Sequence, residues 1–165
     1  MLFRSASGGQ GKTNEAILSR GNVKGVVKLF KKTFHTPSTR RRIEFLIEAK
    51  LSQGCPAISA PTHLIASNGD LGHFTPFAAG ISLEKTLQNG DVTLVQGIQL
   101  ALAMARATEV LHDQHISHGD LHSENVLVES GENNVVIPHL IDLDNFGAPG
   151  QPDRKSTRLN SSHRL

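Results

Sequence analysis

A short stretch of the chain, residues 118–125 (HGDLHSEN), holds side chains that could do chemistry together. Asp120 supplies a carboxylate, Asn125 supplies an amide five residues further on, and an apolar, strand-like segment follows at 126–128. A tight loop that ends in a strand can aim both side chains at one point. A carboxylate so placed can orient a hydroxyl group and take its proton, and oxygen ligands can hold Mg²⁺ on nucleotide phosphates. The spacing therefore indicates phosphoryl transfer.

A second acidic site lies further along the chain, in residues 140–147 (LIDLDNFG). Asp142 follows an apolar pair that is typical of a buried strand, and an aspartate at the end of such a strand can reach a metal beside the first loop. Asp144 is a rival for this role. Asp142 is favoured, because Ile141 before it completes the expected strand.

Both segments resemble motifs of the protein kinases. Residues 111–128 are similar to the catalytic loop H-R-D-L-x-x-x-N of the eukaryotic-like family, with Asp120 at the position of the catalytic base and Asn125 at that of the second metal ligand. Asp142 matches the Mg²⁺-binding aspartate of the D-F-G motif, although Leu143 and Asp144 replace its Phe and Gly. The resemblance extends over about residues 5–150.

The N-terminal part resembles the nucleotide-binding half of the same family. Residues 9–14 (GQGKTN) are similar to its glycine-rich loop, in which Gly9 and Gly11 would let the backbone approach the phosphates. Lys28 matches the lysine that pairs with the nucleotide phosphates. Its partner should be a glutamate on the next helix, where Glu44 and Glu48 both qualify, and Glu48 better fits the distance to the hinge-like segment at 75–77.

The resemblance implies a Ser/Thr protein kinase domain that uses ATP and Mg²⁺ and transfers the γ-phosphate to a hydroxyl group. The string HGDLH, residues 118–122, also occurs in small-molecule kinases of the aminoglycoside and choline type, so a small-molecule acceptor is an alternative. A non-catalytic binding module is a third hypothesis. Gly119 stands where many regulated protein kinases carry an Arg that pairs with a phosphorylated loop, so no such switch is expected.

The strands that must position these residues are expected in three pairs. The first pair, residues 16–18 and 26–30, flanks a Gly21-Asn22 turn, and the second, residues 62–66 and 71–77, flanks Asn68-Gly69-Asp70. The third pair, residues 126–128 and 135–137, surrounds a turn at Gly131-Glu132-Asn133. All three pairs are therefore predicted to be antiparallel.

Helical periodicity appears in two segments. One helix should run from an N-cap at Ser38 to a stop near Gly54 and Pro56, and a long one from about residue 92 to 112. The result is an α+β pattern: an antiparallel N-lobe sheet with one helix, then the first part of a mainly helical C-lobe. We expect a nucleotide-binding lobe over residues 1–77, a partial second lobe with the catalytic loop over 78–153, and a non-native tail over 154–165.

A complete two-lobed kinase needs roughly 250 residues, more than the 165 of this chain. We therefore expect a fragment that folds poorly and has little activity by itself. Its net charge of +2 indicates no nucleic-acid or membrane partner, and its single cysteine, Cys55, excludes an internal disulfide. No apolar run reaches the ~20 residues of a membrane span. The expected location is the cytoplasm.

Two other functions are disfavoured by the sequence. Residues 6–13 fit a loosened P-loop, but no apolar strand precedes them and Gly21 soon breaks any helix. Four histidines at positions 112, 115, 118 and 122 suggest zinc, but no cysteine lies nearby and only two of them could share a short metal turn.

Overall fold

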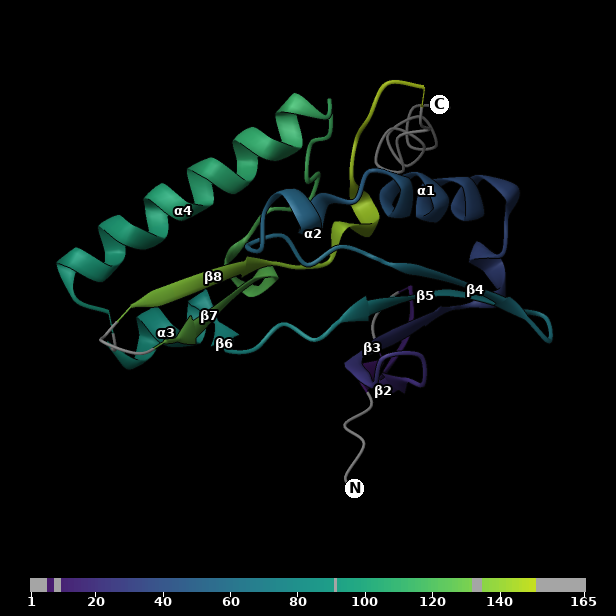
Figure 1. Ribbon diagram of the computed structural model, residues 1–165, viewed down its shortest axis with the longest axis horizontal. Helices are drawn as coiled ribbons and strands as arrows, with labels where there is room; N and C mark the ends of the chain where they lie inside the picture. The colour runs from purple at the N-terminus through teal and green to yellow at the C-terminus, as the bar shows by residue number, and fades with distance from the viewer. Residues whose placement is uncertain (1–5, 8–9, 91, 132–134, 151–165) are drawn as a thin grey trace, which may run out of the picture. The chain divides into compact units, whose positions relative to one another are not determined.

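The computed structural model describes residues 6–7, 10–90, 92–131 and 135–150, which form two compact units that divide between Ala78 and Ala79 (Figure 1). Gly9, the turn residues Glu132 and Asn133, and the predicted tail at 154–165 lie outside these ranges. Each unit has a sheet of its own, and both sheets are antiparallel. The combination of antiparallel sheets with separate helices confirms the α+β prediction.

The first unit is built on a five-stranded sheet in the order β1-β2-β3-β5-β4. Its strands are β1 (Ala6–Ser7), β2 (Gly11–Leu18), β3 (Val23–Phe30), β4 (His63–Ser67) and β5 (Asp70–Pro76). The pairs β2–β3 and β4–β5 are the first two hairpins predicted from the sequence. The strand β3 lies at the centre of this sheet.

Left-handed backbone conformations close both hairpins. Gly21 (φ 88°) and Asn22 (φ 51°) occupy the turn between β2 and β3. Asn68 (φ 54°) and Gly69 (φ 77°) form a two-residue turn between β4 and β5, where Ser67 pairs with Asp70. Glycine and asparagine tolerate positive φ best, and consecutive left-handed residues match the twist of the flanking strands. The sequence therefore fixes the register of the β4–β5 pair.

One helix of three turns packs on this sheet. A 3-10 turn, η1 (Lys32–Phe34), leads into α1 (Pro37–Glu48), and the short α2 (Leu51–Gly54) follows. The predicted N-cap at Ser38 is wrong: the cap is Thr36, whose side chain accepts a hydrogen bond of 3.1 Å from the Thr39 amide. Pro37 fits the first helical position, since its fixed φ suits a helix and its missing N–H would have had no helical partner.

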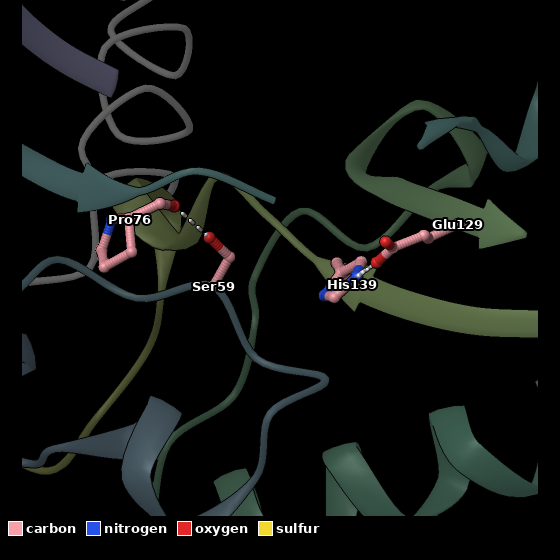
Figure 2. Close-up of polar contacts among 4 residues, drawn as sticks. All are labelled: Ser59, Pro76, Glu129 and His139. Atoms are coloured by element: carbon pink, nitrogen blue, oxygen red, sulfur yellow. Dashed lines mark hydrogen bonds and ion pairs between the residues drawn. The ribbon is translucent and has the colours of Figure 1, made fainter. Parts of the chain in front are cut away.

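The core of the first unit lies between α1 and the sheet. Phe30, Ile43 and Leu71 are buried together, and three partly buried apolar residues pack against them: Phe34, Ile47 and Leu64. Beyond the end of α2, the Ser59 hydroxyl donates a 3.4 Å hydrogen bond to the Pro76 carbonyl at the end of β5 (Figure 2). The connection from α2 to β4 is thereby tied to the end of β5.

The second unit combines a three-stranded sheet with two helices. Its elements are β6 (Ile81–Ser82), α3 (Leu83–Asn89), α4 (Leu94–Asp113), η2 (Ser123–Asn125), β7 (Val126–Ser130), β8 (Val136–Leu140) and η4 (Leu143–Asn145). The sheet order is β6-β7-β8, and β7–β8 is the third predicted hairpin. His139 Nε2 lies 3.0 Å from Glu129 Oε2 across this hairpin (Figure 2).

The long helix α4 packs on β8 and begins two residues later than predicted. A capping box sets its start: the Thr93 side chain accepts from the Gln96 amide, and the Gln96 side chain accepts from the Thr93 amide. Leu100 of α4 is buried with Val128 and Val136 of the hairpin. The helix α3 was not predicted, because only seven residues separate its cap at Ser82 from its end.

One face of α4 is apolar and exposed. Leu94, Val95, Ile98 and Leu102 are 82%, 65%, 61% and 52% exposed, and three of them follow one another at four-residue spacing. None of the helices in the described ranges combines the length and the apolar character that crossing a membrane requires.

Candidate active site

The chain enters the candidate site through a tight reversal at the end of α4. His115 adopts a left-handed conformation (φ 57°), and the Ile116 amide donates a 2.8 Å hydrogen bond back to the Leu111 carbonyl. This arrangement is a common way to end a helix, and it usually places an apolar residue against the last turn. Ile116 is that residue here, with 1% of its surface exposed. The loop that starts at Ser117 is thereby anchored to the core of the second unit.

Two segments predicted to act together lie side by side. The backbones of Ser117 and Gly147 exchange two hydrogen bonds of 2.8 and 2.9 Å. Further along, the Ile141 amide donates to the Asn125 carbonyl at 3.0 Å. Phe146, 1% exposed, is buried in the second segment. Residues 117–125 and 141–147 therefore form one connected structure within the second unit.

His118 links the same two segments through its side chain. Its Nε2 lies 2.9 Å from the Ile141 carbonyl oxygen, and because a carbonyl can only accept, Nε2 carries the proton. Burial lowers the pKa of His118, and this effect outweighs the opposing influence of the Ile141 carbonyl and of the Asp142 and Asp120 charges. The ring is therefore neutral at physiological pH, and its Nε2 proton is engaged in the hydrogen bond that joins the two segments.

Asp120 and Asn125 are held close together by the loop that joins them. The Asn125 side-chain nitrogen donates a 2.9 Å hydrogen bond to the Asp120 backbone carbonyl. This contact commits the nitrogen end of the amide and leaves its oxygen as the end that suits a cation. Asn125 is 8% exposed, so its position is well defined.

The carboxylate of Asp120 has a partner that the sequence did not suggest. Asn145 Nδ2 donates a hydrogen bond of 3.2 Å to Asp120 Oδ2. Asn145 belongs to the 3-10 turn η4, 25 residues away along the chain. No spacing rule links the two residues. The sequence offered one clue to Asn145, because it lies in the segment that was expected to face the catalytic loop.

Asp142 and Asp144 differ sharply in environment. Asp142 has a left-handed backbone (φ 58°, ψ 54°) and an exposed side chain, whereas Asp144 is 8% exposed. The strand β8 ends at Leu140, so the expectation that Ile141 completes this strand is wrong: its amide pairs with Asn125 instead. The chain leaves the strand direction at Asp142, because a residue in the left-handed conformation cannot continue a strand. Exposure, rather than the end of the strand, favours Asp142 as a metal ligand.

The predicted nucleotide-binding residues lie in the first unit. Lys28 is on the central strand β3, where it pairs with Thr13 of β2 and with His73 of β5. Gly11 is the first residue of β2, and a Cβ there would lie 2.1 Å from the Leu29 carbonyl oxygen. Close packing between neighbouring strands is therefore sufficient to require glycine at position 11.

The two candidate partners of Lys28 occupy different surroundings on α1. Glu44 Oε1 accepts a 2.8 Å hydrogen bond from Arg40 Nε, one turn earlier on the same helix. Glu48, in the last turn, is exposed. Neither contact decides between the two glutamates, and the pairing of Glu48 with Lys28 stays a prediction.

A comparison with protein families matches the chain to a model described as protein tyrosine and serine/threonine kinase, over residues 6–156. The match spans most of the sequence and both structural units. This chain belongs to the protein kinase family. The resemblance seen in the sequence is thereby confirmed, and with it the general class of phosphotransferase.

A kinase acts on a nucleotide held with Mg²⁺, and the residues of the second unit fit such an ion. Mg²⁺ typically takes one or two protein oxygen ligands and completes its shell with phosphates and water. The Asp142 carboxylate and the Asn125 amide oxygen would supply two such ligands, and a hydrogen bond joins the Asn125 backbone to Ile141, the residue before Asp142. Across the described ranges, no group of three or more His, Cys, Asp and Glu side chains is gathered to hold a metal without a nucleotide.

Gly119 of this kinase has a structural reason that the sequence did not show. Its backbone is left-handed (φ 73°), and a Cβ there would lie 2.1 Å from the Asn145 carbonyl oxygen. A side chain at position 119 would therefore collide with the segment that contacts Asp120. Glycine is therefore required at this position by close packing, whether or not an arginine there would serve regulation.

Proposed function

We propose that this protein is an ATP- and Mg²⁺-dependent kinase that phosphorylates serine or threonine hydroxyl groups of other proteins. The observation that carries the proposal is the connection between the two segments of the second unit. Asn125 is bonded to the Asp120 backbone at 2.9 Å and, through its own carbonyl, to Ile141 at 3.0 Å, beside Asp142. This connection supports the proposal, because phosphoryl transfer requires a proton acceptor and metal ligands that are held close together.

In the proposed reaction, Asp120 accepts the proton of the acceptor hydroxyl. The oxygen of that hydroxyl forms a bond to the γ-phosphorus of ATP, and the bond from the γ-phosphorus to its bridging oxygen breaks, so that ADP leaves with the electron pair. Asp142 and Asn125 would bind Mg²⁺, which neutralises the developing charge on the phosphates. Lys28 would pair with the nucleotide phosphates and with Glu48, and Gly9 and Gly11 would admit the phosphates close to the backbone. His118 orients the loop and takes no part in proton transfer.

The assignment of Asp120 and Asp142 is tested by substitution in the full-length protein. Asp120→Asn should reduce transfer of labelled γ-phosphate by at least about a hundredfold while ATP still binds, because only the proton acceptor is lost. Asp142→Asn should abolish Mg²⁺-dependent transfer. Asp113→Asn, at the exposed end of α4, is the matched control and should leave transfer unchanged.

Two results would overturn these roles. If Asp142→Asn retained activity and Asp144→Asn abolished it, the metal ligand would lie two residues later than proposed. If Asp120→Asn were fully active, the proposed base would be wrong. Retained ATP binding with no transfer in the unsubstituted protein would favour the non-catalytic binding module.

The chemical class of the acceptor is tested by its phosphorylated products. Transfer to serine or threonine, to tyrosine and to a small molecule all require a carboxylate and a metal in this arrangement. Phosphoamino-acid analysis of a labelled peptide library, beside assays with an aminoglycoside and with choline, separates them. Phosphoserine and phosphothreonine are the expected products, and the cytoplasm is the proposed location.

A further inference from the structure

We propose that Asn145 is a positioning residue that fixes the orientation of the Asp120 carboxylate. The proposal rests on the proposed function, since it assigns Asn145 to the same reaction. The contact that carries it is the 3.2 Å hydrogen bond from Asn145 Nδ2 to Asp120 Oδ2. An aspartate side chain has two rotatable bonds, and a donor that engages one oxygen also defines where the other oxygen points. A proton acceptor must be oriented in this way to meet the hydroxyl of its substrate.

The backbone around Asn145 is built so that this contact can form. Residues 143–145 make the 3-10 turn η4, which is anchored on both sides by buried side chains: Leu143 is 2% exposed and Phe146 is 1% exposed. The Phe146 amide donates a 3.1 Å hydrogen bond to the Leu143 carbonyl and closes the turn. Asn145, between these anchors, is half-buried, so its amide is held rather than free to move through solvent.

Gly119 provides a second, independent observation. The Asn145 carbonyl oxygen would lie 2.1 Å from a Cβ at position 119, so the two backbones touch just before Asp120. The approach exists only because residue 119 lacks a side chain. The hydrogen bond at Asp120 and the glycine at position 119 thus belong to one arrangement, in which η4 lies directly against the catalytic loop.

This arrangement bears on regulation of the kinase. In kinases with an arginine at the position of Gly119, pairing with a phosphorylated loop helps to order the site. Here a neutral amide from η4 holds the carboxylate by a contact within the second unit. The hydrogen bond from Asn145 thus orients Asp120 without a phosphorylated residue.

The test compares three substitutions in the full-length protein by their effects on kcat and on the KM for ATP. Asn145→Ala should lower kcat about tenfold with little change in KM, because a hydrogen bond to a charged group that acts in the reaction is lost. Asn145→Asp keeps the shape but replaces the donor with a negative charge beside Asp120, and should lower kcat further than Ala. Ser117→Ala is the control: its hydroxyl makes only a 3.5 Å contact with the Gly147 carbonyl, between the same two segments, and kcat should be unchanged.

The order of the two Asn145 variants separates positioning from packing. A purely structural role predicts that Asp, which has nearly the shape of Asn, is tolerated better than Ala, and that result would overturn the inference. Unchanged kcat in Asn145→Ala would overturn it as well. If Asp120→Asn is inactive in the same assay while Asn145→Ala is fully active, only the positioning role fails; if Asp120→Asn is active, the proposed function itself fails.

Discussion

Replacing Gly119 with alanine tests the close approach on which the catalytic loop depends. The residue has φ 73°, a conformation that costs about 1–2 kcal/mol for a residue with a Cβ. The new Cβ would also lie 2.1 Å from the Asn145 carbonyl oxygen and 2.9 Å from the Asn145 carbonyl carbon, both backbone atoms that cannot rotate away. Relieving an overlap of this kind typically costs about 1–3 kcal/mol. We therefore expect Gly119→Ala to lower the free energy of unfolding by about 2–5 kcal/mol.

A matched substitution separates the two costs. Gly90, at the C-terminal end of α3, has nearly the same backbone conformation (φ 71°), but a Cβ there meets no heavy atom of the described residues within 4 Å. Gly90→Ala should therefore cost only the conformational part, about 1–2 kcal/mol. The difference between the two variants measures the overlap with Asn145.

Urea denaturation of the full-length protein, followed by far-ultraviolet circular dichroism, gives both free energies of unfolding. Phosphoryl transfer assayed below the unfolding transition should be reduced in Gly119→Ala, because Asn145 is displaced, and unchanged in Gly90→Ala. Equal destabilisation of the two variants would show that position 119 has room for a side chain and that η4 does not lie against the loop at that position.

Further predictions concern pH, nucleotide binding and helix capping. Burial lowers the pKa of His118 in the folded protein below its value in the unfolded chain. The stability that neutral His118 contributes is therefore fully present above about pH 6.5 and is lost as the pH falls from there toward the folded-state pKa. The substitution His118→Asn should reduce this acid sensitivity in denaturation curves. Glu48→Gln should raise the KM for ATP more than Glu44→Gln, because Glu44 is engaged by Arg40; equal effects would contradict the choice of Glu48 as the glutamate that pairs with Lys28. Thr36→Ala should cost about 1 kcal/mol through loss of the α1 cap, as a shift of the urea midpoint would show.

The sequence predicted the elements of this fold well where local chemistry decides them. Asn68-Gly69 forms a two-residue hairpin because both residues accept positive φ, and the same reasoning located the turn at Gly21-Asn22. The position of the α1 cap was missed by two residues, because Thr36 and Ser38 are both good caps and only Pro37 distinguishes them. The helix α3 was missed because seven residues give too little periodicity to recognise.

The site was predicted less completely, for a different reason. The types and spacing of Asp120, Asn125 and Asp142 are visible in the sequence, since a loop of fixed length joins the first two and a motif marks the third. The contact of Asn145 with Asp120 depends instead on how the chain returns after β8. The left-handed conformation of Asp142, directly after the hydrogen bond from the Ile141 amide to the Asn125 carbonyl, is likewise not marked by any local pattern in the sequence.

Gly119 shows why such contacts change the meaning of a sequence difference. Comparison with the H-R-D motif shows only that glycine stands in the place of arginine, and it indicates no more than the absence of a phosphorylation switch. In the structure, the same glycine lets the Asn145 backbone come within reach of the loop, and the Asn145 side chain then bonds to Asp120. An arginine substituted at position 119 would therefore not introduce a phosphorylation switch by itself. It would displace η4, because the collision is with a backbone carbonyl, and the Asp120 carboxylate would lose its hydrogen bond from Asn145.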